Sequence, residues 1–179
     1  MDMEENYYIK FINFFRSYGL YDEQMFNYIW SNSIFYNDLE IECEDCAGIY
    51  YILDKSNKLL KFNLIVPYIN NEKTLFINIH EYMHAIYAYY YLGQKIKIDE
   101  TSEAIALLFE KIYLDEFYSH SLNEYKNKLN TIRNNSCDKK YVLGLKIADE
   151  LLLNYKKKLS FKDLNKKSKR LLKKYKYLK

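Results

Sequence analysis

An H-E-x-x-H sequence, running from His80 to His84, combines the residue types that could hold and use a metal ion. Histidines four residues apart lie on one face of a helix, one turn from each other, so both imidazoles can reach one tetrahedral ion. Glu81 projects beside the position that the histidines leave open, where a carboxylate can accept a proton from a metal-activated water. Two of the three histidines in the chain form this pattern. We therefore predict a helix over residues 74–92 with two zinc ligands, the alternative being a coincidental histidine pair on a surface helix.

A catalytic zinc site needs a third protein ligand and one open position. Gly93 stands where a helix C-cap glycine belongs, and the polar residues 94–102 predict a loop. A second helix is predicted from Glu103 to Glu110, with Thr101 or Ser102 near its N-cap. If this helix packs antiparallel to the histidine helix, Glu103 in its first turn can complete the site. The alternative for Glu103 is a carboxylate favoured at the helix N-terminus by the helix dipole.

Two other glutamates near Glu103 have less certain roles. Glu100 competes with Glu103 as the third ligand, but it lies in the predicted loop and has no second carboxylate in phase with it. Glu110 lies seven residues, or two turns, beyond Glu103 on the same face. It could accept a hydrogen bond from a ligand histidine, or it could be an ordinary solvated glutamate.

These residues resemble the gluzincin arrangement of zinc peptidases, in which H-E-x-x-H is followed by a glutamate on the next helix. The second helix is similar to the E-x-x-S-x-x-x-E helix of the oligoendopeptidase F and thimet oligopeptidase family, with Ala106 in the serine position. The resemblance covers about residues 59–153, the catalytic core alone. It implies a zincin-like core, one zinc ion, and His80, His84 and Glu103 as its ligands.

A third segment, residues 141–148, is similar to the Y-x-x-G-x-x-x-A helix that follows the metal ligands in oligoendopeptidase F. The resemblance implies that Tyr141 faces the substrate and helps to stabilise the tetrahedral intermediate. Tyr141, Gly144 and Ala148 would share one helical face, and the two small residues would let this helix approach another closely. Because the chain contains 21 tyrosines, Tyr141 could equally be a packing residue.

The remaining sequence predicts one α+β domain of mostly helical class, with a small antiparallel hairpin before the active-site helix. Residues 1–47 would carry N-terminal helices, residues 48–156 the catalytic core, and residues 157–179 a basic C-terminal helix. By periodicity and turn chemistry we expect helices at 6–18, 22–35, 122–133, 140–156 and 161–177, and strands at 48–54 and 59–66 joined by a turn at 55–58.

Cysteine usage and the acidic first residues predict a reducing, cytoplasmic setting without a signal peptide. Cys43 and Cys46 form a lone C-x-x-C for which a free-thiol loop is the preferred interpretation, since Cys137 is the only other cysteine. His120 is most simply a surface residue between helices. No apolar run approaches the length of a membrane span.

The C-terminal residues 155–179 contain twelve Lys and Arg and one acidic residue. Such a basic end can bind nucleic acid or anionic lipid. We favour a packing helix with a lysine-rich outer face, because the sequence Ser160 to Asp163 predicts a helix cap and the apolar residues that follow recur at helical spacing.

We therefore expect a cytoplasmic zinc metallopeptidase that acts on a peptide or protein substrate, with Glu81 and Tyr141 as catalytic residues. An edge strand beside the metal could bind an extended peptide by main-chain hydrogen bonds. One alternative is a small regulatory H-E-x-x-H protease that cleaves a single cytosolic protein. The other is a non-catalytic module that binds nucleic acid or membrane through its basic helix.

Overall fold

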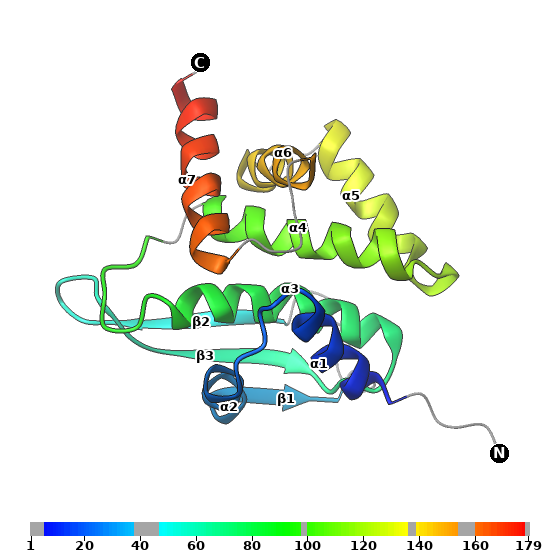
Figure 1. Cartoon of the computed structure of the whole chain (residues 1–179), viewed down its shortest axis with the longest axis horizontal. Coiled ribbons are helices and arrows are strands. Elements are labelled where there is room, and N and C mark those ends of the chain that lie inside the picture. Colours follow the sequence, from blue (N-terminus) through cyan, green and yellow to red (C-terminus); the bar gives the residue numbers. More distant parts are fainter. Residues whose placement is uncertain (1–5, 38–46, 98–99, 136–138, 154–159, 178–179) are drawn as a thin grey trace.

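Helices dominate the part of the chain that the computed structural model describes, residues 6–37, 47–97, 100–135, 139–153 and 160–177 (Figure 1). The elements in chain order are α1 (Tyr7–Ser17), α2 (Glu23–Ser31), β1 (Ser33–Tyr36), β2 (Gly48–Leu53), β3 (Leu59–Pro67), α3 (Glu72–Tyr89), α4 (Glu100–Phe117), a short 3₁₀ turn (His120–Leu122), α5 (Asn123–Asn135), α6 (Lys139–Leu153) and α7 (Phe161–Tyr177). A small three-stranded sheet accompanies these helices. The predicted α+β, mostly helical class is confirmed.

The sheet has the strand order β1-β3-β2, in which β2 is antiparallel and β1 parallel to β3. The predicted hairpin is present, and Asn57 supplies the turn with a positive φ of 63°, a conformation that asparagine tolerates better than most residues. Among the described strands, β2 pairs only with β3. It is therefore an edge strand, as expected for the hairpin beside the histidine helix.

The first strand corrects one prediction. We expected a single helix over residues 22–35, but α2 ends at Ser31 and residues 33–36 form β1. The backbone N–H of Asn32 closes the last turn of α2, and its side chain donates to the carbonyl of Tyr28 at 2.8 Å. The apolar residues that follow pair with β3, so a tertiary contact decides a segment whose local pattern suits either structure.

The start of α3 is defined by a capping box between Asn71 and Thr74, in which each side chain accepts a hydrogen bond from the other residue's backbone N–H. One turn later the buried Asn78 side chain donates to the carbonyl of Pro67 at 2.9 Å, which ties α3 to the end of β3. Together these contacts determine where along the sheet the histidine turn lies.

Helix α3 is buried on most of its surface because it lies between two layers (Figure 1). The sheet lies on one side of it and α4 on the other, and α1 and α2 contact it as well. Aromatic rings fill the contact of α3 with α1 and α2, where Phe11, Phe15 and Phe26 surround the fully buried Tyr82. Tyr82 belongs to the H-E-x-x-H turn, so the motif is anchored to the core on the side opposite its histidines.

Helix α4 begins earlier than predicted. Residues 100–102 belong to its first turn, and Thr101 and Ser102 are buried within the helix instead of capping it. Gly93 has the expected positive φ of 72°, but α3 already ends at Tyr89, so Gly93 lies in the turn after the helix. Glu103 remains in the first turn of α4, as predicted.

Helix α6 packs closely along α4, and Gly144 lies at the point of contact. A Cβ at Gly144 would lie 3.1 Å from Cγ of Glu103 and 3.3 Å from Cδ1 of Leu107. Ala148 is also fully buried. The predicted close approach of a glycine and alanine face is confirmed, and it occurs directly at Glu103.

Helix α7 is a packing helix, as we favoured. Phe161, Leu164 and Leu172 are buried, and the backbone N–H of Asp163 donates to Ser160 Oγ at 3.2 Å, which confirms the predicted cap. Most of its lysines lie on the outer surface.

Several further predictions depend on where residues lie. His120 is exposed in the 3₁₀ turn, as expected. No helix in the described ranges is long and apolar enough to cross a bilayer. The predicted free-thiol loop with Cys43 and Cys46, together with Cys137, lies outside the described residues.

Candidate metal centre

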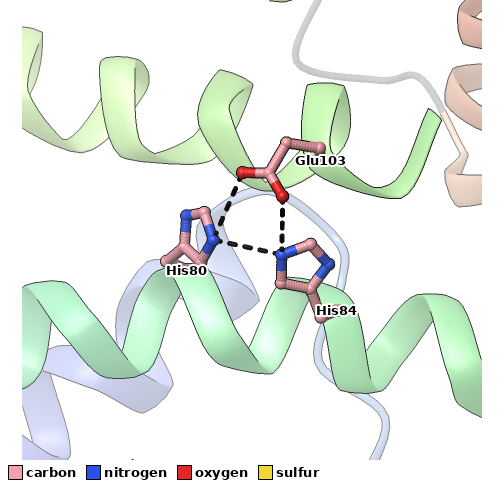
Figure 2. A group of neighbouring side chains, drawn as sticks. All are labelled: His80, His84 and Glu103. Carbon is pink, nitrogen blue, oxygen red and sulfur yellow. Dashed lines mark hydrogen bonds and ion pairs between the residues drawn. The ribbon is translucent and has the colours of Figure 1, made fainter. Parts of the chain in front are cut away.

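His80 and His84 project from one face of α3 toward Glu103 of α4 (Figure 2). The two Nε2 atoms are 3.1 Å apart. Glu103 Oε1 lies 3.6 Å from His80 Nε2, and Glu103 Oε2 lies 3.6 Å from His84 Nε2. Among the described residues, these three form the group of side chains that could hold a metal ion. The predicted convergence of His80, His84 and Glu103 is confirmed.

The separations fit a tetrahedral zinc site. Zinc–nitrogen and zinc–oxygen bonds of about 2.0–2.1 Å imply about 3.3–3.4 Å between ligand atoms at tetrahedral angles. The Nε2–Nε2 distance of 3.1 Å and the two 3.6 Å distances, each to a different oxygen of Glu103, lie on either side of this value. With one donor atom from each residue, the three atoms lie within 4.8 Å of one another. The side chain of Glu103 is only 2% exposed, so its carboxylate is directed at the histidines and not at solvent. A two-histidine, one-carboxylate set with one position to spare is also a donor set that catalytic zinc uses.

Each histidine has a polar side chain beside its other ring nitrogen. His80 Nδ1 lies 3.0 Å from Glu110 Oε1, and His84 Nδ1 lies 2.7 Å from Ser102 Oγ. With a hydrogen on each Nδ1, both Nε2 lone pairs face the common centre, which is the tautomer that a metal ligand needs. Of the two alternatives considered for Glu110, the structure favours the partner of a ligand histidine over a solvated surface residue.

The charges around His80 favour a cation. Burial alone would lower the pKa of this imidazole, but the nearby carboxylates of Glu110, Glu103 and Glu81 raise it to about 10. A raised histidine pKa means that the surroundings stabilise positive charge. Three carboxylates around one largely buried imidazole therefore create a negative potential that stabilises a proton or a divalent metal ion.

The three donor residues line a pocket of about 260 Å³. Glu81 and Tyr141 also line it, and the remaining wall comes from Ser102 and from residues 47–49 and Tyr51 of the β2 segment. This volume is below the roughly 300–1,000 Å³ of typical small-molecule sites. The pocket can therefore enclose the atoms around one bond of a substrate, while a longer substrate would extend beyond it.

Glu100, the competing ligand candidate, points elsewhere. Its Oε2 lies 3.0 Å from Lys176 Nζ of α7, and the ion pair helps to lower its pKa against the effect of burial. Glu103, and not Glu100, is therefore the carboxylate that converges with the two histidines, as predicted. Tyr141, which the Y-x-x-G-x-x-x-A resemblance predicts to face the substrate, borders the pocket, and 37% of its surface is exposed.

Sequence reasoning missed two residues of this site. Ser102 looked like a helix cap, and its contact with His84 could not be expected before the early start of α4 was known. Tyr51 is one of 21 tyrosines, and the only available signal was the alternation of strand β2, which places it on the buried side of the sheet.

No described protein family, no curated protein and no solved structure matches the chain. The likeness to gluzincins thus rests on the quoted motifs.

Proposed function

We propose that the chain is a zinc-dependent peptidase that uses His80, His84 and Glu103 as ligands and Glu81 as its general base. The observation that supports this most strongly is the convergence of three donor atoms from two helices, with Glu81 of the same H-E-x-x-H turn in the same pocket. Zinc at this position would supply Lewis-acid activation of a water molecule and of the carbonyl that the water attacks.

The proposed roles follow from position. Glu81 would accept the proton of the attacking water and then deliver it to the departing amine. Tyr141 borders the pocket from α6 and is proposed to donate to the developing oxyanion. Residues 47–49 of the β2 segment border the pocket too, so a peptide added to this edge strand would bring its carbonyl toward the metal whatever its side chains.

Metal analysis and hydrolysis together test the proposal. We expect one zinc per chain in purified protein, lost in His84→Ala. Glu81→Gln should keep the zinc and stop hydrolysis of a mixed peptide library. Glu124→Gln is the matched control, since this carboxylate lies at the surface 3.8 Å from Lys73 Nζ, and it should change neither property. Full activity in Glu81→Gln would refute the general-base role.

Two alternatives are distinguished by the same experiments. A zinc protein that leaves mixed peptides intact but cleaves one cytosolic protein would be a small regulatory protease. A protein that binds no metal but binds DNA or RNA in a salt-sensitive way would be a non-catalytic module acting through the lysines of α7. The donor set supports a zinc peptidase of either kind over the non-catalytic module, and the range of substrates cleaved separates the two kinds.

A further inference from the structure

Tyr51 lies near the middle of β2, the strand that forms one wall of the pocket. In the antiparallel register it is opposite Phe62, which is fully buried. Since alternate residues of a strand face opposite sides, Tyr51 faces the side of the sheet on which α3 packs, and its neighbour Tyr50 faces away with 62% of its surface exposed. Tyr51 therefore brings a phenol into the pocket from the strand side.

The surroundings of this phenol place it among the reacting groups. Burial, and then the negative charges of Glu81 and Glu103, raise the pKa of Tyr51, while a hydrogen bond with Ser102 acts to lower it. Tyr51 also lines the same pocket as Glu81, Ser102 and Glu103, which places its side chain beside the proposed general base and one proposed ligand. It keeps its proton at neutral pH and remains a hydrogen-bond donor.

Ser102 determines which way that donor points. When His84 Nε2 faces the metal position, its Nδ1–H donates to Ser102 Oγ across 2.7 Å. The hydroxyl hydrogen of Ser102 is then free to donate to the oxygen of Tyr51. In this arrangement the Tyr51 O–H can donate to a group in the pocket that Tyr51 lines.

We propose that Tyr51 is a catalytic residue that donates a hydrogen bond to the oxygen that becomes negative when a peptide carbonyl is attacked, with Ser102 as its positioning residue. The inference rests on the proposed peptidase function. Tyr141 reaches the same pocket from α6, but it is more exposed to water. A donor that is held in place and shielded from water stabilises a developing charge more effectively than an exposed one.

Two probes of similar size separate this role from a structural one. Phenylphosphonate presents tetrahedral, negatively charged oxygens to zinc and its surroundings, whereas thiophenol binds zinc through sulfur and offers no oxygen. Their dissociation constants for the zinc-loaded protein are measured by calorimetry in the wild type, Tyr51→Phe, Tyr141→Phe and the matched control Tyr50→Phe. A hydrogen bond to a charged group is worth about 1.5–3 kcal/mol, so its loss corresponds to about tenfold to hundredfold weaker binding.

We expect Tyr51→Phe to weaken the binding of phenylphosphonate about tenfold to hundredfold. Thiophenol binding, zinc content and melting temperature should stay at the values measured for Tyr50→Phe. Equal loss of both probes, or loss of zinc, would assign Tyr51 a structural role and overturn the proposal. So would unchanged phosphonate binding, or a loss confined to Tyr141→Phe. Because the measurement needs no turnover, a protein that shows the expected binding pattern but hydrolyses no peptide would refute the peptidase function and leave Tyr51 as the oxyanion donor of a different reaction.

Discussion

Removing the carboxylate of Glu110 should weaken zinc binding although Glu110 is not itself a ligand. Its Oε1 lies 3.0 Å from His80 Nδ1, and the two side chains are only 13% and 14% exposed, so water screens their interaction weakly. A hydrogen bond to a charged group contributes about 1.5–3 kcal/mol, and each 1.4 kcal/mol is tenfold in affinity. Glu110→Ala should therefore weaken zinc binding about tenfold to hundredfold, which agrees with the usual effect of outer partners of metal ligands.

Glu110→Gln provides an intermediate step. The amide oxygen can still accept from His80, but a neutral hydrogen bond is about half as strong as a charge-assisted one, so we expect a loss of about tenfold or less. The control is Glu100→Gln, which removes the same charge from the same helix but only breaks the ion pair with Lys176. Zinc affinity is measured by competition with a chromophoric chelator. If Glu110→Ala binds zinc as tightly as the Glu100 control, the carboxylate does not support the ligand and the reasoning is wrong.

Three further changes probe the supports of the site. Gly144→Ala should lower zinc affinity severalfold, because the new methyl group would lie 3.1 Å from Cγ of Glu103. The better helix propensity of alanine should offset the effect of this close contact on the free energy of unfolding. An unchanged zinc affinity in the chelator competition would contradict this prediction. Asn71→Ala removes the cap of α3 and should cost about 1 kcal/mol, seen as a fall in melting temperature of about 2–4 °C. Tyr141→Phe should lower kcat about ten- to a thousandfold at constant zinc content, and unchanged turnover would make it a packing tyrosine.

The convergence of His80, His84 and Glu103 could be predicted because their signals are local. The spacing of His80 and His84 acts within one helix, and Glu103 needed only the assumption that the next helix packs antiparallel. Gly144 also carried a local signal, since a small residue in a helix indicates a close approach even when the neighbour is unknown. The confirmed positions are those in which the sequence period alone determines the face on which a residue lies.

The remaining features depend on contacts between distant segments. Residues 34–36 are apolar or aromatic, which suits a helix or a strand, and pairing with β3 decides the outcome. Ser102 resembles a cap until the start of α4 is known, and its contact with His84 bridges two helices. Tyr51 differs from other tyrosines of the chain only in what lies opposite it. The roles of such residues can be recognised only once the three-dimensional structure shows which distant segments lie next to each other.

The division of the donors between α3 and α4 also links metal supply to folding. An ion held by His80, His84 and Glu103 would join two helices that otherwise meet through packing and two polar contacts of the histidines. Because the ion binds the native chain and not the unfolded one, its binding free energy adds to the stability of the native state. At free zinc one hundred times the dissociation constant this addition is about 2.7 kcal/mol. For a chain of 179 residues it corresponds to a melting temperature higher by roughly 5–10 °C. The lifetime of the protein in a cell would then follow zinc availability, and a zinc-starved cell would lose the protein together with its activity.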